Sequence, residues 1–240
     1  MKKRRLAVDI ETMTVPERSG YGIVIPNYAI VAVPDKPEDG ISEFMYVLMG
    51  QTPQINKGLA VDGEGMAFWF EMCAKNYPGA MEAMLPSLTL QNSEGFIKRV
   101  GYEVERVSDG VNTGAWTPNQ AIMIMQRGSD VYSVDTDIEA EIYGNGCNFD
   151  CSILQENHRV MYGNGNLWKY NAPQNARTLK GLLKEDERAD MDAVVKVQLQ
   201  KFVDKYDKCL KQGYMELHHP LYDAAREALQ ISFCLSLKQS

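Results

Sequence analysis

The first candidate for chemistry is a pair of acids on one short apolar stretch near the start of the chain. Residues 6–12 read Leu-Ala-Val-Asp-Ile-Glu-Thr, and apolar side chains alternate there with Asp9 and Glu11. This period of two is typical of a β-strand, so both carboxylates project from one face, about 6.5–7 Å apart. Such oxygen ligands suit Mg²⁺ or Mn²⁺, and a bound ion would relieve their mutual repulsion. Taken alone, the pair fits a solvated strand end equally well.

A third acid follows a glycine-rich stretch in the second half of the chain. Residues 144–149 read Gly-Asn-Gly-Cys-Asn-Phe and lead into Asp150. Glycines allow the backbone to turn sharply after the strand expected over 138–143. Asp150 then lies in the first turn of a helix expected over 150–160, where a simple helix cap is the alternative interpretation.

A fourth acid lies near the C-terminal end, behind two histidines. His218, His219 and Pro220 precede a helix expected over 221–237, and Pro220 suits its first turn. Asp223 in that turn has the alternative role of a partner for the helix dipole. Histidine titrates near pH 6.5, and four acids with such a base suit phosphodiester cleavage by two divalent ions.

The elements that must position these residues are predicted from periodicity and from turn-forming residues. Residues 13–21 and 50–65 are expected to be irregular, and residues 87–133 form an expected insertion in a single domain spanning 1–240. The resulting order is an antiparallel three-stranded meander, a helix, the insertion, a strand and three helices, which predicts an α/β fold with a mixed central sheet. Besides the elements above, strands are expected over 22–33 and 41–49, helices over 66–76 and 186–210, and a helix start at 117–127.

Composition excludes several classes of protein. The chain has 240 residues, 45% of them hydrophobic, and no stretch approaches the ~20 apolar residues of a membrane span. Five scattered cysteines without a Cys-x-x-Cys pair disfavour zinc and disulfides. The net charge of −7 disfavours broad electrostatic binding of duplex nucleic acid. We expect a soluble cytoplasmic protein in which metal ions supply positive charge within a small site.

The order and spacing of the motifs resemble the DEDDh branch of the DnaQ-like 3′–5′ exonucleases, which have the RNase H-like fold. The resemblance is closest to phage exonuclease A and the related short 3′–5′ exoribonucleases, which implies host cytoplasm if the chain comes from a phage. The segments that carry it are Asp9-Ile10-Glu11-Thr12, residues 144–150 continuing to Ile153-Leu154, His218 with Asp223-Ala224 five residues later, Phe68-Trp69, and Arg177-Thr178.

The resemblance implies a role for each matched residue. Asp9, Glu11, Asp150 and Asp223 would hold two Mg²⁺ ions, for which Mn²⁺ would substitute. His218 would be the general base, and Glu11 would also take part in catalysis. Thr12 and Phe149 would contact the substrate, and the product would be a nucleoside 5′-monophosphate.

These observations lead to one preferred function and several alternatives. We expect a metal-dependent 3′–5′ exonuclease on single-stranded DNA, with an exoribonuclease as the nearest alternative because the sequence identifies no contact to a 2′-OH. A non-catalytic RNase H-like nucleic-acid-binding scaffold is a second class, which four grouped acids argue against. A two-metal hydrolase acting on a small nucleotide ranks lower. The oligomeric state is open.

Overall fold

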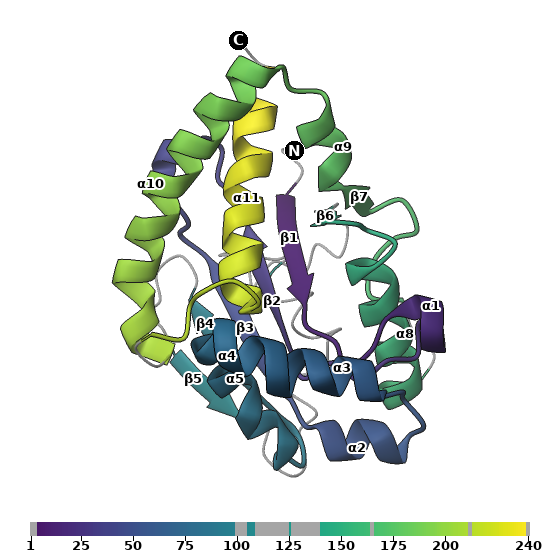
Figure 1. Cartoon of the computed structure of the whole chain (residues 1–240). Helices are drawn as coiled ribbons and strands as arrows, with labels where there is room; N and C mark the ends of the chain where they lie inside the picture. Colours follow the sequence, from purple (N-terminus) through teal and green to yellow (C-terminus); the bar gives the residue numbers. More distant parts are fainter. Residues whose placement is uncertain are drawn as a thin grey trace.

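A computed structural model describes residues 4–98, 105–108, 125, 140–163, 166–210 and 213–238. The described strands form one mixed sheet with the order β5-β4-β3-β2-β1-β6-β7 (Figure 1). From β1 to β5 each strand pairs antiparallel with the next, whereas β6 runs parallel to β1 and β7 parallel to β6. The strands are β1 (Arg4–Ile10), β2 (Asn27–Ala32), β3 (Phe44–Met49), β4 (Ser93–Lys98), β5 (Glu105–Ser108), β6 (Ala140–Gly144) and β7 (Pro173–Asn175).

Strand β1 lies where the sheet changes from antiparallel to parallel pairing. Because β1 and β6 are parallel, their carboxyl ends lie at the same edge of the sheet. The acids at the end of β1 and the glycine-rich loop after β6 therefore meet there, which is where open α/β sheets commonly bind ligands.

Helices cover both faces of the sheet. Leu6 and Val8 of β1 pack in one core with α8 (Asp150–Tyr162), whereas Ala7 packs in the other with α10 (Glu185–Leu210) and α11 (Pro220–Leu237). Figure 1 shows α10 and α11 lying side by side over that second face. Since side chains alternate along a strand, Asp9 and Glu11 project toward the α11 face.

Small residues bring α11 close to the sheet. Ala224, Ala225 and Ala228 are fully buried on the helix, and they pack in one cluster with Ala7 and Ala29 of the sheet. Short side chains on both surfaces allow the two backbones to approach closely, so acids on α11 can reach acids on β1.

A nearly continuous helical segment borders the carboxyl end of β1. It consists of α3 (Gly63–Ala67), the π-helical turn η2 (Phe68–Cys73) and α4 (Ala74–Asn76). Trp69 is fully buried, and its Nε1–H donates a 3.0 Å hydrogen bond to the carbonyl oxygen of Thr12. This bond fixes the helical segment to the chain just after Glu11.

The predicted mixed sheet with flanking helices is confirmed, as are the main strands and long helices. The prediction of irregular structure over 13–21 and 50–65 is wrong in part, because α1 (Pro16–Ser19), α2 (Gln51–Asn56) and the start of α3 lie there. The first two are short and lack a side-chain cap, so local sequence signals them weakly. The remaining elements are α5 (Pro78–Met84), α9 (Ala176–Gly181) and the short 3₁₀ turns η1 (Pro37–Asp39) and η3 (Leu85–Leu88).

The insertion expected over 87–133 includes β4 and β5, which form an antiparallel pair extending the sheet beyond β3. The helix start expected at 117–127 lies outside the described residues, apart from Met125. The insertion and the single domain therefore stay predictions. In the described part of the chain, no helix is both long and apolar enough to span a membrane.

Candidate active site

The carboxyl end of β1 places two acids beneath α11. Asp9 lies opposite Ala29 in the β1–β2 register, and the N–H of Glu11 donates to the carbonyl oxygen of Asn27 at 3.0 Å. Burial raises the pKa of both carboxyl groups well above the usual range, and the nearby charges of Asp223 and Asp150 raise it further. Two such groups are stable together only as protonated acids or with a bound cation.

The loop after β6 turns back so that Asp150 lies very close to Gly144, the last residue of that strand. Gly144 ends the strand, and a β-carbon at this position would lie 2.8 Å from Oδ2 of Asp150. The backbone of Ile10 lies close enough to the Asp150 carboxylate to lower its pKa, which brings the second motif next to β1. Burial raises the pKa of Asp150 to about 7, and the charge of Glu227 adds to this rise.

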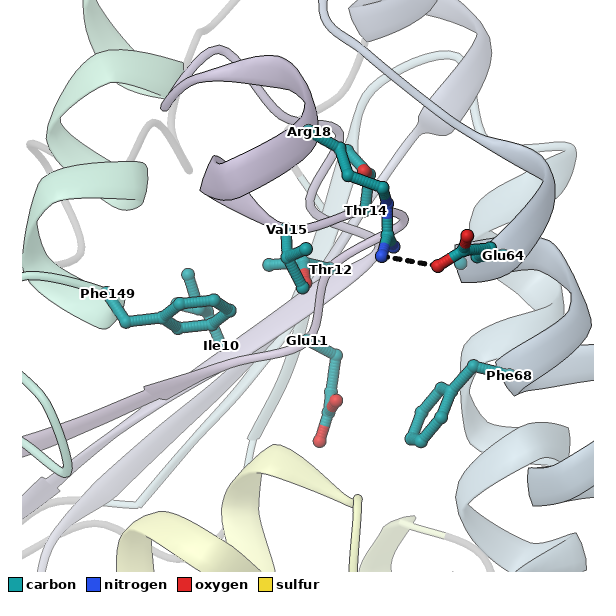
Figure 2. A pocket seen from close by; sticks show the side chains of 10 residues that line it. Ile10, Glu11, Thr12, Thr14, Val15, Arg18, Glu64, Phe68 and Phe149 are labelled. Atoms are coloured by element: carbon teal, nitrogen blue, oxygen red, sulfur yellow. Dashed lines mark hydrogen bonds and ion pairs between the residues drawn. The ribbon is translucent and has the colours of Figure 1, made fainter.

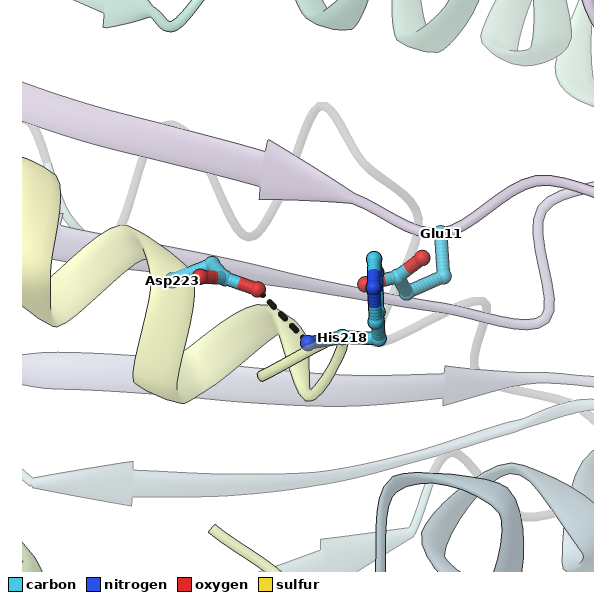
Figure 3. A group of neighbouring side chains, drawn as sticks. All are labelled: Glu11, His218 and Asp223. Carbon is cyan, nitrogen blue, oxygen red and sulfur yellow. Dashed lines mark hydrogen bonds between the residues drawn. The ribbon is translucent and has the colours of Figure 1, made fainter. Parts of the chain in front are cut away.

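The third motif joins a histidine to the last acid. His219 caps α11 by accepting a hydrogen bond from the N–H of Leu221, and Asp223 follows in the first turn. The N–H of His218 donates a 2.8 Å hydrogen bond to Oδ2 of Asp223, as Figure 3 shows. One ligand atom from each of Glu11, His218 and Asp223 lies within 4.8 Å of the other two.

The two adjacent histidines occupy different environments. The ring of His218 lies edge-on to the rings of Phe68 and Tyr77, with centroids 5.2 and 4.8 Å away. His218 also lines a cavity that it shares with the four predicted acids, called the acid cavity below. His219 is fully buried and packs against the ring of Tyr46. Burial lowers the pKa of both, that of His219 to about 4. Only His218 is placed to exchange a proton with a molecule in the cavity.

All four predicted acids line one cavity. It has a volume of about 540 Å³ and is lined by Asp9, Glu11, Asp150, Asp223 and His218, together with Arg177 and Phe149. A neighbouring cavity of about 400 Å³ shares Glu11 and Phe149 and is also lined by Thr12, Arg18 and Phe68. In Figure 2, Phe149 and Phe68 stand on opposite sides of it with Glu11 between them. The predicted site residues therefore line two adjoining cavities.

The donor set of the acid cavity suits a hard divalent cation. Arg226 contacts Asp223 at 2.9 Å, but among the described residues no ion pair joins Asp9, Glu11 or Asp150 to a basic side chain. Carboxylate oxygens are the ligands that Mg²⁺ and Mn²⁺ prefer, and a cation would compensate charge that the described protein groups leave uncompensated.

Comparison with known protein families agrees with this geometry. A family model described as the 3′–5′ exoribonuclease Rv2179c-like domain matches residues 4–235, which is nearly the whole chain. The chain belongs to this family. It is therefore a 3′–5′ exonuclease with a nucleic-acid substrate. Comparison with curated proteins finds no match.

Two residues near the site of this exonuclease were not predicted from sequence. Glu227 is 4% exposed on α11, and Lys180 of α9 contacts it at 3.3 Å. The signal available for Glu227 was its spacing, because residues four apart share one face of a helix and Asp223 lies four positions earlier. Lys180 carries no comparable signal, since only the fold brings α9 beside α11.

Proposed function

We propose that this exonuclease uses two divalent metal ions to remove nucleotides from the 3′ end of single-stranded RNA. The observation that carries the proposal is the meeting of four acids from three distant segments in one cavity, beside a histidine. A scaffold protein would gain nothing from grouping Asp9, Asp150 and Asp223 in one cavity, because their mutual repulsion opposes folding.

The strand order supports a DEDDh-type site on an RNase H-like fold. An antiparallel run from β1 to β3 is followed, on the other side of β1, by the parallel strands β6 and β7. This is the arrangement that the resemblance of the three motifs implies, with each motif at a strand end or a helix start.

The acids would hold the metal ions, and the other groups would handle the proton and the substrate. Asp9, Glu11, Asp150 and Asp223 supply carboxylate oxygens from β1, α8 and α11. Held there, two divalent ions would activate water and stabilise the charge that develops on the phosphate and the leaving oxygen. The product would be a nucleoside 5′-monophosphate.

His218 fits the role of general base. Burial lowers its pKa below the ordinary value, so the ring is mostly neutral at pH 7 and can accept a proton from the attacking water. The rings of Phe68 and Tyr77 restrict its orientation, and Glu11 and Asp223 lie close by. Figure 3 shows its ring beside the side chain of Glu11.

The smaller cavity suits the terminal nucleoside. Its two phenylalanines can pack against the faces of a base, an interaction that every base can make. Thr12 lines the same cavity next to Glu11, so a sugar bound beside Thr12 would lie near the acids. Thr12 and Phe149 are thus proposed to contact the substrate.

RNA is proposed as the substrate on the strength of the family description, which names an exoribonuclease. The preference for DNA expected from the sequence has no support from the structure or from the family. Both polymers present the same phosphates and stacking surfaces, so discrimination requires a contact to the 2′-OH.

The test is a comparison of matched RNA and DNA oligonucleotides labelled at the 5′ end, with Mg²⁺ or with EDTA. We expect a ladder that shortens from the 3′ end, faster for RNA, and absent with EDTA or with Asp9→Asn. A 3′-blocked strand should resist digestion. Faster digestion of DNA would overturn the choice of RNA, and metal-independent cleavage would overturn the proposed mechanism.

A further inference from the structure

We propose that Lys180 is a positioning residue, which ties the loop carrying Asp150 to the helix carrying Asp223 and thereby sets the spacing of the acids. The inference rests on the proposed function, because it concerns the same acids. Lys180 itself lines neither cavity described above. It acts through Asn145 and Glu227.

The ammonium group of Lys180 contacts three acceptors from two separate elements. Its Nζ lies 2.9 Å from Oδ1 of Asn145, 3.1 Å from Oε1 of Gln230 and 3.3 Å from Oε1 of Glu227. An ammonium has three N–H donors, so these contacts use its full capacity. The Lys180 side chain is 22% exposed and that of Glu227 is 5% exposed, which limits competition from water.

These contacts form a tether between Asn145 and Glu227, which lie in the two segments that carry the predicted metal ligands Asp150 and Asp223. Asn145 follows Gly144 in the loop that leads to Asp150. Glu227 lies one helical turn after Asp223, on the same side of α11. A rigid connection between Asn145 and Glu227 therefore fixes the separation between the second and third motifs.

Glu227 itself adds charge to an already acidic region. Its charge contributes to the raised pKa of both Asp9 and Asp150, after the larger effect of their burial. Lys180 compensates that charge locally. Apolar residues of the same size in place of a buried ion pair often leave a fold equally stable or make it more stable, so stability alone does not account for such a pair. A positioning role explains why a charged pair occupies this place.

The decisive variant is the double substitution Lys180→Met with Glu227→Gln. It removes the tether while leaving the net charge unchanged, and Glu227→Gln alone measures the effect of losing the Glu227 charge. Glu227→Gln alone keeps an acceptor oxygen for Lys180. A control of the same charge type is Arg5→Met with Glu141→Gln, which removes a 3.1 Å ion pair between β1 and β6, at the opposite end of β1 from the acids. Arg5 is about as exposed as Lys180, at 25% against 22%, whereas Glu141 is more exposed than Glu227.

Four quantities are measured on each protein: the kcat and KM for a short RNA at saturating Mg²⁺, Mn²⁺ binding by calorimetry without RNA, and Tm. Residues that support metal ligands typically contribute about 10- to 100-fold to metal affinity or activity. We expect the double variant to lose kcat and Mn²⁺ affinity by about that factor, with KM changed by less than about threefold. Glu227→Gln should keep kcat within about threefold at saturating Mg²⁺.

A merely structural tether would lower Tm and leave kcat and Mn²⁺ binding at wild-type values, as in the control, and this result would overturn the inference. If the double variant does not fold, Lys180→Gln is compared with the control in the same way. Absence of Mn²⁺ binding and of metal-dependent cleavage in the wild-type protein would overturn the proposed function, and the inference with it. Normal wild-type behaviour with an unaffected variant would overturn the inference alone.

Discussion

The main-chain N–H of His218 donates a 2.8 Å hydrogen bond to Oδ2 of Asp223, so the proposed base and a proposed metal ligand form one local unit. His218 has a φ of 66°, which makes it the only non-glycine residue with positive φ among those that the structure describes. This left-handed conformation costs about 1–2 kcal/mol for a residue with a β-carbon. The hydrogen bond to Asp223 helps to hold this backbone conformation, and the conformation directs the ring of His218 toward Glu11.

Substitution of His218 should mainly lower activity, whereas substitution of His219 should mainly lower stability. His218→Ala should lower kcat by about 10²–10⁴-fold, the usual contribution of a general base, with Mn²⁺ binding changed much less. His219→Ala should lower the free energy of unfolding by about 1–3 kcal/mol, because it removes a helix cap and a buried ring, and should cost less activity. Steady-state rates and chemical denaturation check both; a larger rate loss for His219→Ala would contradict the assignment.

Neutralising one acid should remove activity and stabilise the metal-free protein. Asp9→Asn deletes a proposed ligand, but it also relieves the repulsion from Asp223, Asp150 and Glu11. We expect cleavage to be abolished and Tm in EDTA to rise. Asp192→Asn, an exposed change on α10, is the control and should alter neither quantity. Near-normal cleavage by Asp9→Asn would show that the site is elsewhere.

Two glycines, one at the end of β6 and one in the loop after it, provide a matched steric test. A β-carbon at Gly144 would crowd Oδ2 of Asp150, whereas one at Gly146 would meet nothing closer than 3.9 Å. Gly144→Ala should therefore displace Asp150 and lower kcat by about 10-fold or more, since small displacements of catalytic groups are costly. Gly146→Ala should remain within a few-fold of wild type. Equal rates for the two variants would mean that Asp150 tolerates the displacement.

The raised pKa of Asp150 predicts a stability that depends on pH and metal. The folded pKa of about 7 exceeds the ordinary value of 3.8, so the folded state favours the protonated form. In EDTA this contribution to stability should be complete below about pH 4 and lost as the pH rises to about 7. Mg²⁺ should offset the loss by binding the carboxylate. Chemical denaturation of the wild type and of Asp150→Asn from pH 4 to pH 7 checks this prediction. The free energy of unfolding of the variant should depend less on pH, and an identical dependence in both proteins would contradict the raised pKa of Asp150.

Much of the fold follows from local patterns in the sequence. The alternation around Asp9 and Glu11 identifies β1, and the glycine-rich stretch before Asp150 identifies the end of β6. The apolar stripe identifies α10, and Pro220 marks the start of α11. These features depend on neighbours in sequence, so periodicity and turn-forming residues are sufficient to predict them.

The parts that could not be predicted depend on contacts between distant segments. Lys180 gains its neighbours only when α9 packs beside α11, and Glu227 is buried because alanines bring α11 onto the sheet. Two adjacent histidines cannot be ranked from sequence without the family motif, whereas the cap at His219 and the left-handed backbone of His218 separate them in the structure.

The approach of Gly65 to the first motif limits how the enzyme can adapt to different nucleotides. A β-carbon on Gly65 would overlap the carbonyl oxygen of Met13, and Trp69 holds the same helical segment to Thr12. The wall that carries Phe68 is thus immobilised against the acid-bearing strand. A purine and a pyrimidine differ in width by a whole ring, so under the proposed function the opposite wall, formed by Phe149, would be the side that yields to admit both.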